Sequence, residues 1–325
     1  MKTQGKAKGY LLGAAAAASY GLNPTFALPL YADGMNPDSV LLFRYGFAIP
    51  IIAAMIVIRG RSFKVEKGSV LPLAVLGILM ALSSLTLFMS YNHMAAGIAS
   101  TILFVYPIMV AVIMSIFFKE KISMQTILCI LLATSGILFL YRGADGQTLS
   151  LKGTSLAVGS ALAYALYLVG VNNKRVSHLA TLTVTFYVLC FGVLLFAGRL
   201  LLAGISAEGA SNAAAGLTIP SRWYLWLDAL ALAALPTTVS LLCTTAAIQI
   251  IGSTPTAILG ALEPVTAVIM GMLFFSEGMT GREAFGIAMI LAAVSFVIAG
   301  GKDGGKVIAR HLTRFRHLFP NLRRK

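Results

Sequence analysis

One stretch of this 325-residue chain occurs twice. Residues 95–141 and 252–299 each contain an apolar segment with a proline, a Phe-Phe-x-Glu end, a short turn and a second apolar segment. The offset between the copies is constant, so that Pro107 falls on Pro264 and Glu120 on Glu277. An internal duplication of this kind predicts a molecule made of two halves of similar build.

The composition excludes an ordinary soluble domain. The chain is 58% hydrophobic and 11% charged, whereas soluble domains carry about 25% charged residues. Of the 25 Lys and Arg residues, only Arg44 lies well inside an apolar run. This pattern is typical of a polytopic membrane protein, in which each spanning helix needs about 20 apolar residues.

The apolar runs predict ten transmembrane helices. They cover residues 9–30, 38–58, 69–91, 95–118, 123–141, 153–173, 180–202, 223–249, 254–276 and 282–300. The duplication aligns helices 4 and 5 with helices 9 and 10, so that each half has five spans, and an odd number inserts the second half upside down. We therefore expect an all-α integral membrane protein with two inverted five-helix repeats, at 8–141 and 152–300, followed by a basic cytoplasmic tail at 301–325.

The basic residues predict the orientation. With the N-terminus inside, most Lys and Arg lie in inner segments, and the few outer ones are Arg142, Lys152, Arg199, Arg222 and Arg282. The positive-inside rule then places both termini in the cytoplasm. The net charge of +14 is interpreted as a topology signal and an attraction to anionic lipid, not as a nucleic-acid footprint.

Two segments outside the spans leave alternatives open. Apolar residues from Ile308 to Leu322 recur at helical steps among basic ones, which fits an amphipathic helix on anionic lipid or a disordered basic tail. The Gly-, Ala- and Ser-rich stretch 204–221 is interpreted as a flexible linker, with a lid over the outer mouth as the alternative.

Several predicted spans carry polar residues or prolines that a lipid-facing helix does not need. The residues that we single out are Asn23, Ser83, Thr86, Tyr106, Pro107, Tyr164, Tyr167, Thr237, Ser240, Thr244, Thr256, Gly260, Glu263 and Pro264. A proline inside a span frees a backbone carbonyl and usually bends the helix. Hydroxyls at helical spacing can line a solute path, but they also join packed helices.

Two ionisable groups are predicted at membrane depth, where charge is costly and usually faces a cavity or a partner. Arg44 is near the outer end of helix 2, so a structural residue that snorkels to the interface is a full alternative to a functional one. Its partner would be the helix 9 carboxylate or a carbonyl freed by proline. Glu263 lies nearer mid-span, which favours a cavity-facing role over a carboxylate satisfied by hydroxyls between helices. Pro264 would leave the carbonyl of Gly260 without its helical donor.

No enzyme motif is present in the sequence. It has no Gly-x-Ser-x-Gly, His-Glu-x-x-His or Gly-Lys-Ser/Thr motif. The three cysteines, Cys129, Cys190 and Cys243, lie in apolar runs without metal or disulfide spacing. We expect no catalytic residue, no metal and no cofactor, and transport without bound ATP.

The duplicated residues resemble a known family. Pro107 with Phe117-Phe118-Lys119-Glu120, and Glu263-Pro264 with Phe275 and Glu277, each look like the C-terminal part of an EamA domain. Tyr20-Gly21-Leu22-Asn23-Pro24 resembles the first helix of such a domain, and the second half lacks this Asn-Pro pair. Tyr91-Asn92-His93-Met94 departs from the family pattern, so relatives do not indicate the substrate.

The resemblance implies a member of the drug/metabolite transporter superfamily. It implies a secondary transporter that exports small organic metabolites, such as amino acids or drugs, by alternating access. We expect it in the inner (plasma) membrane, with a monomer favoured. The alternatives are a sugar-phosphate or nucleotide-sugar carrier, an integral-membrane enzyme and a non-transporting membrane protein. We expect a midplane site between helices 1, 3, 4, 6, 8 and 9. Apolar parts of the solute would contact Tyr106, Tyr164 and Tyr167, and its polar groups would hydrogen-bond to Asn23, Ser83, Thr86, Thr237 and Ser240. Glu263 would bind an amine or couple a proton. The bends needed for gating would be shaped by Pro107 and Pro264.

Overall fold

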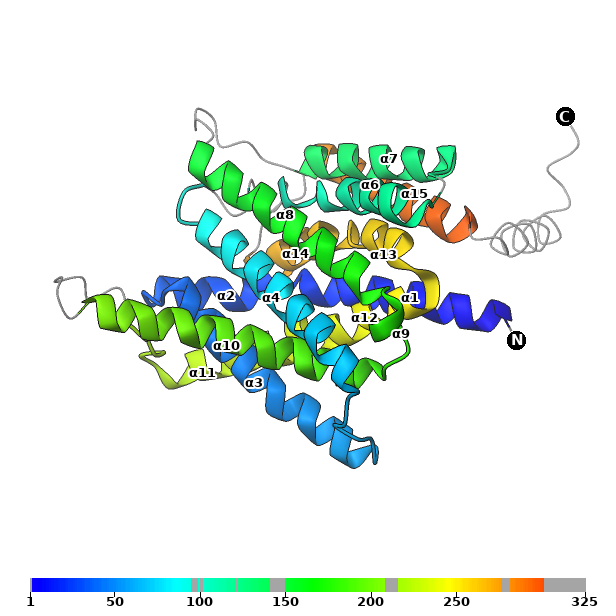
Figure 1. Ribbon diagram of the computed structural model, residues 1–325. Coiled ribbons are helices and arrows are strands. Elements are labelled where there is room, and N and C mark those ends of the chain that lie inside the picture. The colour runs from blue at the N-terminus through cyan, green and yellow to red at the C-terminus, as the bar shows by residue number, and fades with distance from the viewer. Residues whose placement is uncertain are drawn as a thin grey trace, which may run out of the picture.

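The computed structural model describes residues 2–94, 99, 102–120, 122–140, 150–207, 216–275 and 281–300, and within them every regular element is a helix (Figure 1). The basic tail at 301–325, and with it the predicted amphipathic helix, lies outside the described residues. So does Glu277 at the end of the second repeat copy.

The first half contains α1 (Lys2–Tyr20), α2 (Asn23–Ala32), α3 (Pro37–Ile58), α4 (Lys67–Ser90), α6 (Tyr106–Phe118) and α7 (Met124–Leu140). The second half contains α8 (Leu151–Val171), α9 (Lys174–Ser177), α10 (Thr181–Ala207), α11 (Trp223–Leu232), the π-helix η1 (Ala233–Val239), α12 (Ser240–Ile251), α13 (Ser253–Leu259), α14 (Leu262–Phe275) and α15 (Gly281–Gly300).

The long apolar helices confirm the all-α membrane fold. Within the described residues, six helical stretches are long and apolar enough to cross a bilayer: Pro37–Ile58, Lys67–Ser90, Leu151–Val171, Thr181–Leu202, Trp223–Ile251 and Ser253–Met270. Shorter apolar helices cover Tyr106–Phe118, Met124–Phe139 and Ala284–Ile298. The count of ten spans stays a prediction, because several expected spans are divided or shortened.

Three of the expected spans are interrupted close to a proline. The chain turns at Gly21-Leu22 before Pro24, at Phe104-Val105 before Pro107 and at Gly260-Ala261 before Pro264. Proline has no N–H to donate, so it is tolerated in the first turn of the helix that follows. The bends expected at Pro107 and Pro264 are therefore complete interruptions of the helix.

The interruption before Pro264 also changes an expected hydrogen bond. The carbonyl of Gly260 is not left without a donor, because the Glu263 N–H donates to it at 2.9 Å. This tighter bond, to the third residue instead of the fourth, replaces the one that Pro264 cannot make. The usual helical donor to the Gly260 carbonyl is thus missing, as predicted, and the Glu263 N–H takes its place.

A different device accommodates Pro236 in the expected helix 8. Here the helix widens into η1, and the hydroxyls of Thr237 and Thr238 donate to the carbonyls of Leu232 (2.8 Å) and Ala233 (2.9 Å), five residues back. Such π-helical segments are often found at functional sites.

The two halves pack through helix pairs that occur in matched sets. α1 packs on α12 as α4 packs on α8, and α6 contacts α8 as α14 contacts α1. α7 lies along α15, and α3 along α10. In Figure 1 the α7, α6 and α15 group forms one layer, with α3, α10 and α11 on the opposite side of the molecule. This places α1, α8, α12 and α13 between the layers.

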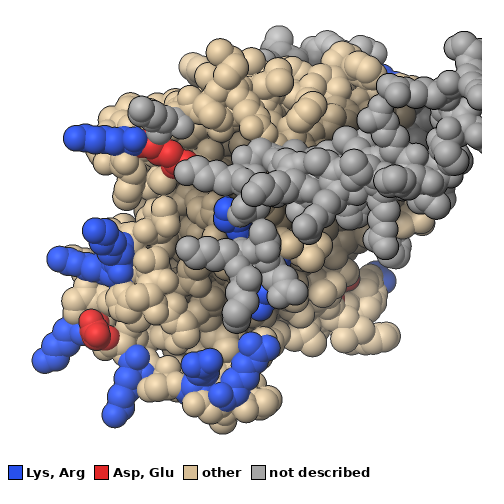
Figure 2. Space-filling model, turned by 90° about the vertical axis from the view of Figure 1, so that its right-hand side faces the viewer, with Lys and Arg blue, Asp and Glu red and all other residues tan. Residues whose placement is uncertain are grey.

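Basic side chains gather at the end of the bundle that carries the N-terminus. Arg59 follows α3, Lys67 begins α4, Lys119 follows α6, and Lys174 and Arg175 lie in α9. Figure 2 looks onto this end and shows Lys and Arg projecting from its rim. We call it the basic end and the other the distal end. That the basic end is cytoplasmic stays a prediction.

Candidate functional site

A cleft with an empty volume of about 230 Å³ lies between the two halves of the chain. Its lining comes from α1, α6, α8, α12, α13 and α14 and consists of Gly13, Ala16, Ala17, Tyr106, Tyr164, Leu168, Thr244, Thr256, Gly260 and Glu263. Three of the predicted site residues, Tyr106, Tyr164 and Glu263, thus share one cleft. Helix α4, the expected helix 3, contributes no residue to this lining.

The interrupted helices meet beside this cleft because glycines allow close approach. A β-carbon on Gly21 would lie 2.5 Å from the carbonyl oxygen of Glu263 and 2.7 Å from Cβ of Thr266. A β-carbon on Gly260 would overlap the hydroxyl of Tyr106. The turn in α1–α2 therefore packs on the start of α14, and the turn between α13 and α14 packs on the start of α6.

Glu263 is the buried carboxylate of the cleft, with 7% of its surface exposed. It is the second residue of α14, and the N-terminus of a helix favours negative charge there. Among the described residues, no Lys, Arg or His lies within ion-pair distance of it. Tyr106 and Tyr164 line the same cleft. The helix N-terminus and two phenols thus lie beside a carboxylate that has no counter-ion among the described residues.

Aromatic rings form one side of the site. The ring of Tyr106 meets Tyr164 edge-on, with centroids 4.8 Å apart, and Tyr164 stacks on Tyr167 at 6.2 Å. Tyr167 is fully buried behind Tyr164, and its hydroxyl lies 3.4 Å from Oγ1 of Thr245. Tyr106 and Tyr164 therefore face the cleft, while Tyr167 supports them.

The predicted hydroxyl-bearing residues lie elsewhere. Ser83 pairs with Ser160 across α4 and α8, where the Ser160 hydroxyl donates to the Ser83 carbonyl at 2.7 Å. The Thr86 hydroxyl donates to the carbonyl of Leu82 in its own helix at 2.8 Å. Neither belongs to the cleft lining, so their expected contact with solute is not visible in this arrangement.

Three further predicted residues are buried outside the lining. Thr237 accepts a hydrogen bond from Arg44 Nε at 2.6 Å. Ser240 is buried in α12, and Asn23 is buried with its Oδ1 lacking a hydrogen-bond partner. Their contact with a solute stays a prediction.

Sequence reasoning expected helix 1 at the site but missed the α1 residues that line the cleft. Gly13, Ala16 and Ala17 carry no polar atom that could mark them, although their spacing puts them on one helix face. The other lining residues, Thr244, Thr256 and Gly260, are among those that the sequence analysis had singled out in the predicted spans. Of the two interpretations left open for Arg44, snorkelling to the interface does not fit, because the residue is only 1% exposed.

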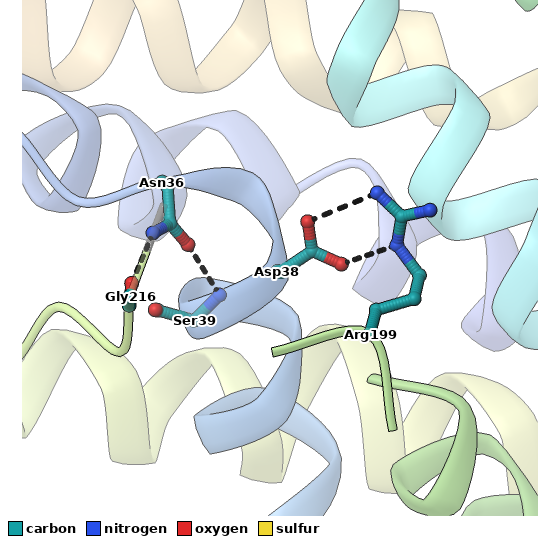
Figure 3. A network of polar contacts seen from close by, with 5 residues as sticks. All are labelled: Asn36, Asp38, Ser39, Arg199 and Gly216. Atoms are coloured by element: carbon teal, nitrogen blue, oxygen red, sulfur yellow. Dashed lines mark hydrogen bonds and ion pairs between the residues drawn. The ribbon is translucent and has the colours of Figure 1, made fainter. Parts of the chain in front are cut away.

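Polar contacts close the distal end between the halves (Figure 3). Arg199 Nε and Nη2 donate to the Asp38 carboxylate at 2.8 and 3.4 Å, and Asn36 Nδ2 donates to the Gly216 carbonyl at 2.7 Å. The Thr218 N–H donates to Ser39 Oγ at 2.9 Å. We call these hydrogen bonds, together with those between Asp33 and Ser221, the distal clasp.

The Asp33 carboxylate completes the distal clasp. It accepts from the Ser221 hydroxyl and, at 2.8 Å, from the Ser221 N–H. These hydrogen bonds lower the pKa of the Asp33 carboxyl below its usual value of 3.8. Residues 216–221 are therefore tied to the first half and do not form the flexible linker that was expected for them; residues 208–215 lie outside the described part.

A smaller set of contacts joins the halves at the basic end. Ser69 Oγ donates to the carbonyl of Arg175 at 2.9 Å, and Tyr187 Oη donates to the carbonyl of Phe63 at 2.8 Å. Ser69 lies in the first turn of α4 and Arg175 follows α8, just as Ser221 precedes α11 and Asp33 follows α2. The two ends thus carry contacts between corresponding positions of the halves.

A curated relative, the uncharacterized transporter sll1319 of Synechocystis, is 28% identical over 225 residues, which cover 68% of this chain and 64% of the relative. A crystal structure described only as that of a protein aligns with a TM-score of 0.73 at 14% identity, covering 90% of this chain and 97% of that one, and so supports the fold alone. A sequence model of the EamA-like transporter family matches residues 7–142 and 151–299, and the chain therefore belongs to this family.

Proposed function

We propose that the chain is a secondary transporter of small organic metabolites that works by alternating access, as an exporter, without bound ATP. The observation that carries this proposal is the position of the cleft. Three interrupted helices from both halves converge on it, and it holds a buried carboxylate that has no Lys, Arg or His within ion-pair distance among the described residues. Discontinuous helices around a midplane site are typical of secondary transporters built from inverted repeats.

The matched packing of the two halves supports the inverted arrangement. Pairs such as α1 with α12 and α4 with α8 are what a two-fold axis in the membrane plane would produce. We infer that residues 8–141 and 152–300 are the inverted repeats, and that one repeat moves against the other during the cycle.

The contacts at the two ends support gating. Both the distal clasp and the Ser69–Arg175 pair are made at once, so contacts between the halves hold each end of the cleft. A solute therefore needs one end to open while the other stays closed. Pro107 and Pro264, each just inside a helix start, position the hinges for this movement.

The roles of the site residues follow from their positions. Tyr106 and Tyr164 contact an apolar part of the solute, with Tyr167 behind them. Glu263 binds an amine or carries a proton. Asn23, Ser83, Thr86, Thr237 and Ser240 are outside the cleft in this arrangement and contact the solute only if opening exposes them. We infer that the transporter works in the inner membrane as a monomer with both termini in the cytoplasm.

Flux through reconstituted protein tests the proposal. Liposomes containing only the full chain would be loaded with a metabolite library, and efflux and uptake would be followed by mass spectrometry. We expect transport of a subset of solutes, abolished by Tyr164→Leu but not by Tyr224→Leu, which changes an exposed tyrosine on α11. Absence of flux for every solute from properly inserted protein would contradict transport.

A further inference from the structure

Arg44 is a cation enclosed inside the bundle. It is the eighth residue of α3, about 10 Å along the helix from Pro37 at 1.5 Å per residue. Its side chain is among the largest fully buried ones of the described chain. Charged groups at such depth are rare and usually face a cavity or a partner.

The described neighbours of Arg44 do not neutralise it. Nε donates to Thr237 Oγ1 at 2.6 Å and Nη2 to the Pro236 carbonyl at 3.4 Å, and both acceptors are uncharged. No described Asp or Glu lies within ion-pair distance of the guanidinium. Nη1 is completely buried and has no hydrogen-bond partner. The structure thus orients one edge of the guanidinium and leaves another edge unused.

Aromatic groups hold the guanidinium in place. Its central carbon lies 5.5 Å from the ring centre of Tyr20 and 5.8 Å from that of Phe88. Tyr31 packs on the same Phe88 ring at 5.8 Å, and its buried hydroxyl also has no partner. Cation–π contacts stabilise the charge in part. The Tyr31 hydroxyl is thus a second buried donor without a partner, on a ring that packs against the same Phe88 side chain as the guanidinium.

The chemistry of these donors favours a carboxylate. A planar guanidinium edge matches the two oxygens of a carboxylate. A phosphate dianion would require a second cation, and among the described residues Arg44 is the only buried Lys or Arg. The aromatic rings of Tyr20 and Phe88 fit an organic acid better than an inorganic anion.

The position of Arg44 connects it with the cleft. Tyr20 lies within electrostatic reach of both Arg44 and Glu263, and the next residue, Gly21, packs on the Glu263 backbone. On the other side, η1 binds Arg44 through Thr237, and the Ser19 hydroxyl of α1 donates to the η1 carbonyl of Leu235 at 2.6 Å. Arg44 therefore lies between the cleft and the distal clasp.

We propose that Arg44 is a carboxylate-binding subsite, in which Nη1 and the Tyr31 hydroxyl bind the carboxylate of an organic solute after the distal clasp opens. The proposal rests on the proposed transport function, since it assigns a chemical group to the solute. Thr237 and the Pro236 carbonyl position the guanidinium, and Tyr20 and Phe88 form its aromatic walls.

Binding of matched probes to the full chain in nanodiscs tests this without requiring transport. The probes are benzoate and benzamide, which differ in charge but hardly in shape, with inorganic phosphate and chloride as further arms. Thermal unfolding at increasing probe concentration gives the affinity. We expect benzoate to stabilise the wild type and benzamide to do so at least about tenfold more weakly, as for loss of a charge-assisted bidentate pair.

Variants identify the group that binds. Arg44→Lys keeps the charge but not the planar edge, and Tyr31→Phe removes one hydroxyl; both should weaken benzoate binding, whereas Tyr224→Phe should not. If Arg44→Lys fails to fold, the comparison of benzoate with benzamide and the Tyr31→Phe variant still test the carboxylate-binding subsite. Equal binding of benzoate and benzamide, binding of phosphate or chloride alone, or unchanged benzoate binding in both variants would overturn the subsite. A failure of flux with benzoate binding intact would instead count against transport.

Discussion

The hydroxyl of Tyr106, in the first half, lies against the α-carbon of Gly260, in the second. A β-carbon on Gly260 would overlap that hydroxyl and lie 2.9 Å from Cζ of the same ring. Tyr106 is 1% exposed and packed edge-on against Tyr164, so its ring has little room to withdraw. The two halves can therefore approach this closely at the cleft only because residue 260 is glycine.

Gly260→Ala should displace Tyr106 and lower both flux and thermal stability. Forcing an extra methyl group into a packed core typically costs about 1–3 kcal/mol. Tyr106→Phe in the same chain removes the overlapping oxygen and should restore part of the stability. Gly159→Ala is the control, because nothing lies within 4 Å of its new β-carbon. Equal melting temperatures for the Gly260 and Gly159 variants would show that the contact is unimportant.

Glu263 should be needed for its charge. Glu263→Gln keeps the size and hydrogen-bonding capacity but cannot ionise, so we expect normal insertion and stability with loss of most flux or of its dependence on pH. Asp228→Asn, which changes a carboxylate of α11 outside the cleft, should leave flux unchanged. The measurement is efflux from liposomes across a pH series. Wild-type flux at every pH in Glu263→Gln, with lowered stability only in Glu263→Ala, would make the residue structural.

Much of the fold followed from patterns that repeat. The duplicated copies put Pro107 and Pro264 in corresponding places, and both lie just after a helix interruption. Whether a proline bends a helix or ends one depends on neighbouring packing, here on Gly260 against Tyr106. One sequence does not contain that contact, so the interruptions themselves were not predicted.

The site could be predicted only at residues whose polar side chains are unusual within an apolar run. Tyr106, Tyr164 and Glu263 stand out as polar groups in apolar runs, and they share the cleft. Ser83 stands out equally but pairs with Ser160, because hydroxyls that join helices and hydroxyls that bind solutes have the same spacing. Ala16 and Ala17 line the cleft without any distinguishing group. The burial of Arg44 depends on Tyr20 and Phe88, which only the fold brings together.

The Ser83–Ser160 pair should contribute to stability and not to solute recognition. Ser83→Ala removes a hydroxyl 3.1 Å from that of Ser160. Hydrogen bonds between membrane helices contribute on average about 0.6 kcal/mol, so we expect a small fall in melting temperature and an unchanged KM for flux. A raised KM with unchanged stability would return Ser83 to the list of solute contacts.

The predicted orientation can be read by chemical labelling. Single cysteines would be placed in a variant without Cys129, Cys190 and Cys243, two at the basic end (Ser62→Cys and His178→Cys) and two at the distal end (Asn92→Cys and Lys152→Cys). All four positions are exposed. The positive-inside rule predicts that an impermeant thiol reagent labels only the distal pair in intact cells. Labelling of the basic pair alone would reverse the orientation.

Both ends should have to open for transport, one at a time. A cysteine pair at Asn36 and Gly216 would replace the 2.7 Å hydrogen bond of the distal clasp, and a pair at Ser69 and Arg175 would bridge the basic end. Alternating access requires each gate to open once per cycle, so either disulfide alone should stop net flux in liposomes. A reductant should restore it, and each single cysteine, oxidised in the same way, should transport normally. Full flux through protein in which the distal pair is completely cross-linked would show that the solute does not pass through the distal clasp.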